Sequence, residues 1–290
     1  MKAIVIGSIN IDRVLEVRKI VKDGETISSS SQKKYLGGKG LNQAIALSNM
    51  FENTYFYANV NPNNKFVVDH MKEHIYKKDY IHHLEEQMGE AFIQVNKNGE
   101  NAIVVSSNSN HMIDILDVTK VLSEFKDGDF IILQNEINNV EDIIDIAKER
   151  GMRVVFNPSP ITSAVNPSLI SKVDYLVLNK AELAEITDIH WTKESIVKFK
   201  KEYPSVRLVV TLGEDGVRYI YQDKKSKVHG KEVEVEDTTC AGDTFLGYFI
   251  GAVLNKKTIT ESLEIATKAA SICVSTKGAS NSIPSKEQVL

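Results

Sequence analysis

The chain has 290 residues, with 35 Lys and Arg against 39 Asp and Glu, and 42% of its residues are hydrophobic. This composition is typical of a globular protein and excludes a collagen-like, disordered or membrane-spanning chain. Because the formal net charge is −4, no basic excess exists to neutralise phosphates, which argues against a protein that binds nucleic acid through bulk charge.

The N-terminal sequence and the cysteine content indicate a compartment. Met1 leads directly into the strand-like segment Ala3–Ile6, without the charged leader and apolar region of a secretion signal. No run of about 18 consecutive apolar residues occurs. The only cysteines, Cys240 and Cys273, imply no disulfide framework. We therefore expect a cytoplasmic protein with no membrane or nucleic-acid partner.

Short aliphatic segments alternate with amphipathic segments of helix length along most of the chain. The predicted strands are Ala3–Ile6, Thr54–Tyr57, Phe130–Leu133, Arg153–Phe156, Tyr175–Leu178 and Arg207–Thr211. The predicted helices are Asn42–Met50, Val140–Glu149, Ala181–Thr187, Lys193–Lys201, Ala241–Leu254 and Thr260–Ser275. This alternation predicts an α/β fold in which helices cover both faces of a mostly parallel central sheet.

Four strand-like segments interrupt this alternation because no helix separates them. They are Arg13–Val17, Ser28–Tyr35, Ala91–Val95 and Ala102–Val105, and an Asn-Gly step between the last two is a hairpin signal. We predict a small antiparallel β lid, at approximately residues 12–35 and 90–106, inserted within a single domain that spans residues 1–290. A lid would exclude water from a ligand crevice, whereas the alternative is an ordinary edge hairpin.

The segment Asp237–Asp243 precedes an apolar helix and contains the small residues Cys240, Ala241 and Gly242. Backbone amides at such a helix start converge with the positive end of the helix dipole, which favours an anion. Asp243 would repel a bound phosphate, but it suits a general base that is aimed at a hydroxyl group. The alternative is an acidic residue that merely stabilises a helix N-terminus.

Two earlier segments also combine turns with polar side chains. Gly37–Gln43 is a glycine-rich turn that enters a helix without the spacing of a P-loop, and its Lys39 and Asn42 suit a small polyhydroxy ligand. Asn10 and Asp12 follow the first strand, so they are expected at the crevice beyond the carboxyl ends of the strands. The alternative for this pair is a simple turn.

Together, Gly7–Asp12, Gly37–Gln43 and Asp237–Asp243 resemble the ribokinase-like, or phosphofructokinase-B, family of carbohydrate kinases over residues 2 to about 284. Further matching segments are Leu133–Glu136, Asn157–Pro160, Asn179–Glu182, Thr211–Gly216 and Lys277–Ala279. The resemblance implies a three-layer α/β/α sandwich and an ATP-dependent kinase of a primary sugar hydroxyl. The leading reaction is D-ribose to ribose 5-phosphate, and a homodimer built through the lid is expected.

The resemblance also implies roles for single residues. Asp243 would be the catalytic base, and the amides of Ala241 and Gly242 would form the anion hole. The sugar would be bound by Asn10, Asp12, Gly38, Lys39, Gly40, Asn42, Glu136 and Asp243. The nucleotide would be bound by Asn179, Glu182, Thr211, Gly213, Gly216 and Gly242.

Two metal ions are expected besides ATP. Asn179 and Glu182 match the residues that organise Mg²⁺ and the nucleotide phosphates in the family. A potassium ion is expected at Asp237, Thr239, Cys273, Thr276, Gly278 and Ser282, largely through backbone carbonyls.

Some positions depart from the family pattern. Cys240 stands where the family usually has Gly or Ala, and the Gly-Asp turn expected after the second main strand is absent from Ala58–Pro62. The sugar is therefore left open among ribose, fructose, deoxyribose and a nucleoside. An alternative of another class is a non-catalytic sugar- or nucleotide-sensing protein, against which the intact Asp243 and the complete glycine turns argue.

Overall fold

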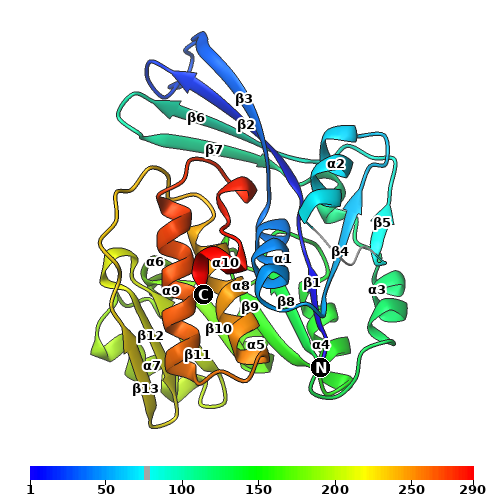
Figure 1. Cartoon of the computed structure of the whole chain (residues 1–290), viewed down its shortest axis with the longest axis vertical. Helices are drawn as coiled ribbons and strands as arrows, with labels where there is room; N and C mark the ends of the chain where they lie inside the picture. The colour runs from blue at the N-terminus through cyan, green and yellow to red at the C-terminus, as the bar shows by residue number, and fades with distance from the viewer. Residues whose placement is uncertain (75–78) are drawn as a thin grey trace.

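The computed structural model describes residues 1–74 and 79–290, which form two sheets with helices packed around the larger one (Figure 1). The larger sheet has the strand order β13 (Lys224–Val228), β12 (Val217–Tyr221), β11 (Arg207–Thr211), β10 (Tyr175–Asn179), β9 (Arg153–Asn157), β8 (Phe130–Gln134), β1 (Ala3–Ile6), β4 (Thr54–Val60) and β5 (Ile81–His83). Its neighbours pair in parallel from β11 to β5, and β12 and β13 add an antiparallel edge. The predicted mostly parallel sheet is confirmed.

Helices bury both faces of this sheet. One core contains side chains from α1 (Lys39–Met50), α2 (Lys65–His74), α8 (Ala241–Leu254), α9 (Ile259–Val274) and α10 (Lys286–Val289). The opposite core contains side chains from α3 (Ile115–Leu122), α4 (Val140–Glu149), α5 (Pro167–Lys172), α6 (Lys180–Thr187) and α7 (Lys193–Glu202). Alternate residues of β1 enter opposite cores, Val5 the first and Ile4 the second, as expected of a strand covered on both sides. This is the predicted three-layer α/β/α sandwich.

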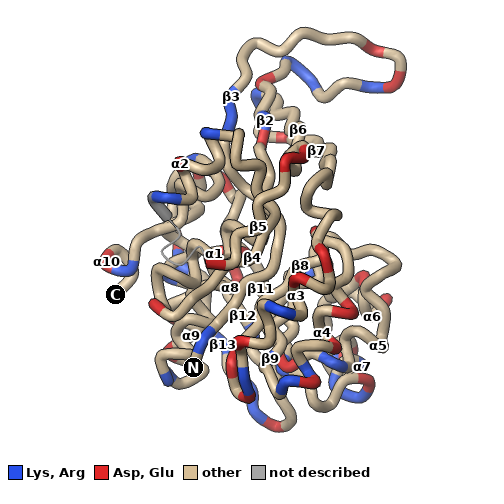
Figure 2. The backbone as a smooth tube through the Cα atoms, turned by 90° about the vertical axis from the view of Figure 1, so that its right-hand side faces the viewer, with Lys and Arg blue, Asp and Glu red and all other residues tan. Residues whose placement is uncertain are grey.

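The smaller sheet projects from the carboxyl end of β1 and has the strand order β3 (Ser29–Gly37), β2 (Asn10–Val17), β6 (Gly89–Asn96) and β7 (Asn101–Ser106) (Figure 1). The β2–β3 and β6–β7 pairs are antiparallel, as predicted, while the central β2–β6 pair is parallel. In Figure 2 the charged loop between β2 and β3 extends farthest from the large sheet. The small sheet therefore stands beyond the edge at which the parallel strands end.

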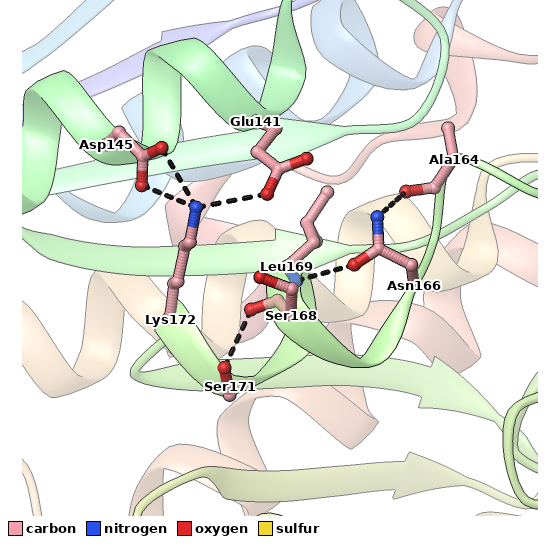
Figure 3. Close-up of polar contacts among 8 residues, drawn as sticks. All are labelled: Glu141, Asp145, Ala164, Asn166, Ser168, Leu169, Ser171 and Lys172. Carbon is pink, nitrogen blue, oxygen red and sulfur yellow. Dashed lines mark hydrogen bonds and ion pairs between the residues drawn. The ribbon is translucent and has the colours of Figure 1, made fainter.

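Polar contacts join α5 to α4 and cap α5, in the helix layer that contains α3 to α7 (Figure 3). Lys172 Nζ lies 3.0 Å from Glu141 Oε1 and 2.8 Å from Asp145 Oδ1, and Asn166 Oδ1 accepts the N–H of Leu169 at 3.0 Å. Such exposed ion pairs contribute roughly 0–1 kcal/mol each. The two ion pairs of Lys172 join α5 to α4 within this layer of the sandwich.

Within residues 1–74 and 79–290, no helix combines the length and the apolar sequence that a membrane crossing requires.

Candidate functional site

A cavity of about 420 Å³ lies between the small sheet and the carboxyl ends of the parallel strands. Its polar wall includes Asn10, Asp12, Gly38, Lys39, Asn42, Glu136, Asn179, Glu182 and Asp243. Its apolar wall comes from β6 and β7, through Ala91, Ile93, Ile103 and Val105. Segments up to 233 positions apart thus form a concave site with hydrogen-bonding groups on one side and aliphatic side chains on the other, an arrangement typical of small-molecule binding.

Asp243 is fixed on this cavity by two side-chain amides. Its Oδ2 accepts from Asn42 Nδ2 at 3.0 Å, and its Oδ1 accepts from Gln43 Nε2 at 2.9 Å. Asp243 lies in the first turn of α8 and is 8% exposed. Cys240 immediately precedes this helix with φ +68°, a left-handed conformation that turns the chain into α8. The backbone therefore delivers a nearly buried, oriented carboxylate beside the helix N-terminus.

Four carboxylates, those of Asp12, Glu136, Glu182 and Asp243, and the ammonium group of Lys39 line the cavity. Burial raises the pKa of Asp12 to about 7, and the negative charges of Glu136 and Asp243 add to the effect. Burial likewise raises the pKa of Glu136. Burial acts to lower the pKa of Lys39, but the carboxylates of Asp243, Glu136 and Glu182 outweigh it, and the net pKa is raised. The site concentrates hydrogen-bond acceptors, which suits a ligand that brings several hydroxyl donors.

Neighbouring polar groups hold the acceptors in place. Glu136 Oε2 accepts from Ser8 Oγ at 2.5 Å and from the N–H of Lys39 at 3.0 Å. Asn10 Oδ1 accepts from Asn110 Nδ2 at 2.8 Å, and Asn110 in turn accepts the N–H of Ile9 at 3.0 Å. These contacts fix Glu136 and Asn10 before any ligand arrives.

A second cavity, of about 590 Å³, adjoins the first. The two share Thr211, Thr238 and Gly242. The second is also lined by Gly213, Gly216, Ala241, Phe245, Thr267, Ala270 and Val274. Gly216 has φ +90°, and a Cβ there would lie 2.1 Å from the carbonyl oxygen of Val228, so this turn requires glycine. The helix start at Gly242 therefore separates two spaces, each large enough for a ligand.

Asn179 and Glu182 stand at the N-terminus of α6, on the wall of the first cavity. Asn179 Oδ1 accepts the N–H groups of Ala181 and Glu182 at 2.8 and 3.0 Å. Glu182 Oε2 accepts the N–H of Asn179 at 2.9 Å. This capping box presents an oxygen-rich pair close to the junction of the two cavities.

The residues predicted to hold a potassium ion converge in the structure. Asp237 Oδ1 accepts the N–H of Thr239 at 2.9 Å and its Oδ2 accepts that of Gly278 at 3.2 Å. Cys273 Sγ lies 3.7 Å from the carbonyl oxygen of Thr239 and 3.2 Å from Ser282 Oγ. The N–H of Thr276 donates to the carbonyl of Cys273 at 3.0 Å. All six residues therefore belong to one cluster beside the start of α8.

Gly40 differs from the other residues predicted to touch a sugar, because it lines neither cavity. Its N–H donates to Ser8 Oγ at 3.2 Å. A Cβ at Gly40 would lie 2.3 Å from the backbone nitrogen of Ser8. The structure thus places Gly40 where it lets α1 approach the end of β1.

Sequence reasoning missed four polar residues that support the site: Ser8, Gln43, Asn110 and Gln134. Gln43 follows Asn42 within the glycine-rich motif, so its position was a usable signal. Ser8 lies between the predicted strand and Asn10. Gln134 lies within the matching segment Leu133–Glu136 but was given no role there, and Asn110 lies in none of the motifs. The hydrogen-bond partners of both residues lie 91 or more positions away in the sequence.

The chain is similar to known proteins over nearly its whole length. A ribokinase from Staphylococcus aureus (strain COL) is 32% identical over 300 residues, covering 99% of this chain and 98% of that protein. The crystal structure of a ribokinase from Thermotoga maritima has a TM-score of 0.87 at 30% identity, covering 100% and 98% of the two chains. An Arabidopsis thaliana ribokinase complexed with ribose and ATP has a TM-score of 0.86 at 27% identity, covering 99% and 97%.

The family comparison is equally extensive. Residues 1–286 match the family described as pfkB family carbohydrate kinase, a span that contains every residue of both cavities and of the Asp237 cluster. The chain therefore belongs to the pfkB family of carbohydrate kinases.

Proposed function

We propose that this protein transfers the γ-phosphoryl group of ATP to a primary hydroxyl of a pentose, with D-ribose to ribose 5-phosphate as the principal reaction. The observation that carries the proposal is the junction of the two cavities at Gly242, next to the oriented carboxylate of Asp243. One cavity would hold the sugar and the other the nucleoside, so that the transferred group lies between them.

The first cavity suits a small polyol. Asp12 and Glu136 offer carboxylate oxygens to hydroxyl donors, while Lys39 and Asn42 offer N–H donors. Ile93 and Ile103 cover the opposite, apolar face of a sugar ring. The likeness to a ribokinase complexed with ribose and ATP supports ribose as the first substrate to test.

In the reaction, the substrate hydroxyl oxygen forms a bond to the γ-phosphorus while the bond from that phosphorus to the β,γ-bridging oxygen breaks. Asp243 takes the hydroxyl proton, and ADP leaves with the electron pair of the broken bond. The amides of Ala241 and Gly242, with the positive end of the α8 dipole, stabilise the charge on the transferring group. Open space adjoins Gly242, since a Cβ there would have no heavy atom within 4 Å.

Asn179 and Glu182 are the residues we assign to magnesium. Their oxygen donors fit a hard cation, and both line the cavity wall. Within residues 1–74 and 79–290 no group of three or more His, Cys, Asp or Glu gathers to hold a metal, which fits a cation that is coordinated largely by substrate phosphates. Bound with the nucleotide, Mg²⁺ would neutralise charge on the phosphate oxygens.

We assign the Asp237 cluster to potassium. One carboxylate and several carbonyl oxygens without strict geometry suit a large monovalent cation better than magnesium. Thr239 of the cluster is separated from Ala241 by Cys240 alone, so an ion there would hold the loop rather than touch the substrate. Asp237 already joins the two loop segments through its two oxygens.

The small sheet is assigned as a lid and as the dimer interface. Its inner face contributes Ile93 and Ile103 to the sugar cavity. On the other face, Phe92 and Val104 are paired across β6 and β7 and are 39% and 67% exposed. A second copy of this chain would cover these side chains, which would otherwise leave apolar sheet in water.

The deciding experiment is a screen for ATP consumption with ribose, deoxyribose, fructose and nucleosides as acceptors, followed by identification of the product. Ribose-dependent formation of ADP and ribose 5-phosphate is the expected result. Preference for deoxyribose, fructose or a nucleoside would retain the kinase and replace the substrate. If no acceptor supports turnover, the alternative of a non-catalytic sugar or nucleotide sensor gains the support.

A further inference from the structure

A chain of buried amides leads from the sheet to Asp243. Gln134, at the end of β8, donates from Nε2 to Gln43 Oε1 at 2.8 Å, and Gln43 donates from Nε2 to Asp243 Oδ1 at 2.9 Å. Gln134 is fully buried and Gln43 is 1% exposed. Neither residue lines either cavity, so neither is placed to touch a substrate.

Asp243 determines which group donates and which accepts at each step of this chain of amides. An ionised Asp243 can only accept, so Gln43 must turn its NH₂ group toward the carboxylate and its oxygen toward Gln134. Gln134 must then turn its own NH₂ group toward Gln43. Its oxygen is left buried without a hydrogen-bond partner among the described residues, against Gly7, where a Cβ would lie only 2.1 Å away.

The unpaired oxygen is informative because a buried, unsatisfied amide oxygen is destabilising. Folding stability alone gives no reason to keep it. Glycine at position 7 provides the room for it, since a side chain there would collide with Gln134. The arrangement therefore favours the orientation of Asp243 over complete hydrogen bonding in the core.

We propose that Gln43, held by Gln134, is a positioning residue that fixes the carboxylate of Asp243 for proton transfer. The inference rests on the proposed phosphoryl transfer. Asn42 fixes Oδ2 and Gln43 fixes Oδ1, so the carboxylate plane cannot rotate. Each oxygen keeps a free lone pair for the substrate hydroxyl.

The test compares Gln43→Met, Gln134→Met and the double variant with the wild type, measuring kcat and KM for ribose at saturating ATP. Gln43→Met should lower kcat about 10- to 100-fold, the range expected for losing a hydrogen bond to a charged group. KM for ribose should change by less than about threefold, because Gln43 does not line the cavity.

The double variant tests whether Gln134 acts on Asp243 through Gln43. If Gln134 acts only through Gln43, the double variant should have the kcat of Gln43→Met, so that the two losses are not additive. Independent, additive losses would overturn the role of Gln134. Gln134→Met alone leaves the Gln43 donor in place and still tests the proposal if Gln43→Met does not fold.

Asn255→Ala is the matched control. Asn255 donates from Nδ2 to the carbonyl of Met50 at 2.8 Å and so joins the same two helices at their far end. It should lower the unfolding midpoint and leave kcat unchanged. If the wild type is active and the kcat of Gln43→Met lies within twofold of the wild-type kcat, this inference is overturned and the proposed function stands. A wild type inactive on every acceptor would overturn the proposed function and this inference together.

Discussion

Asn42 Nδ2 lies 3.0 Å from Asp243 Oδ2, although the two residues are 201 positions apart in the sequence. The contact depends on close packing of α1 against α8. A Cβ at Gly247 would lie 2.5 Å from Ala46 Cβ, and one at Gly251 would lie 2.6 Å from Met50 Cβ. These two glycines let the helices approach, so the turns Gly37–Gln43 and Asp237–Asp243 form one packed unit.

Asp243→Asn removes the proposed proton acceptor with little change of shape. We expect kcat to fall about 10²- to 10⁴-fold, the usual contribution of a general base. Both carboxylate oxygens accept N–H donors, so the new amide would set one N–H group against a donor and lower stability by about 1–3 kcal/mol.

Steady-state kinetics and ribose calorimetry check this prediction. The sugar affinity should change modestly because Asp12 and Glu136 remain. A variant that keeps more than about half of the wild-type kcat would show that Asp243 only stabilises the helix start.

Asp12→Asn should separate binding from stability. The raised pKa of Asp12, about 7 against 3.8 when unfolded, means that the folded protein binds a proton that the unfolded chain releases. The free energy of unfolding therefore falls as pH rises from about 4 to 7, by up to about 4 kcal/mol. The free energy of unfolding of the Asn variant does not fall in this way, because its amide does not ionise. The variant should therefore be more stable than the wild type at pH 8, and its advantage should be smaller at pH 5.

The same substitution should raise KM for the sugar or abolish sugar binding, because hydroxyl groups lose an anionic acceptor. Urea unfolding at both pH values and calorimetry with ribose measure the two effects. Asp23→Asn, in the exposed loop between β2 and β3, is the control and should change neither. A stability gain of equal size at pH 5 and pH 8 would contradict the assigned ionisation.

Much of the fold could be predicted because its strongest signals are local. β1, α4, β11 and α8 have the predicted bounds, since each combines a clear apolar pattern with a sharp end. The antiparallel edge of the sheet was not predicted. β13 reads Lys-Lys-Ser-Lys-Val and lies mostly in water, so neither hydrophobicity nor alternation marks it as a strand.

The candidate site was predictable in outline for a different reason. Its glycine-rich and acidic turns are short motifs that stand at the ends of predictable elements. α1 nevertheless begins at Lys39, three residues before the predicted start, because Gly40 allows the helix to begin against β1. The support of Asp243 by Gln43 and Gln134 depends on contacts 91 and 200 positions apart, which no local pattern contains.

Val104→Lys tests assembly through the small sheet. Val104 is 67% exposed on the face opposite the cavity, beside Phe92, whose ring lies 6.0 Å from the guanidinium of Arg13. A charge buried at a symmetric interface without a partner is strongly unfavourable, so we expect the wild type to be a dimer and this variant to be a monomer of about 32 kDa.

Sedimentation at micromolar concentration measures both states. Leu116→Lys, at a 68% exposed position on α3, is the matched control and should leave the dimer intact. A wild type that sediments only as a monomer would refute the dimer, and dissociation by both substitutions would place the interface elsewhere.

Activation by potassium is expected from the Asp237 cluster. The cluster is followed directly by Cys240 and the anion hole, so an ion that fixes this loop would aim the amides of Ala241 and Gly242 at the transferring phosphate. Potassium should therefore raise kcat more than it lowers the sugar KM. Sodium should substitute poorly, because its smaller radius leaves the carbonyl oxygens too distant.

Asp237→Asn keeps an oxygen for the N–H of Thr239 but removes the charge, and it should abolish the response to potassium. Rates in potassium, sodium and choline chloride at about 0.1 M, with ionic strength held constant, measure the effect. Equal rates in all three salts would leave Asp237 as a structural link between two loops, and a response that survives Asp237→Asn would place the ion at another site.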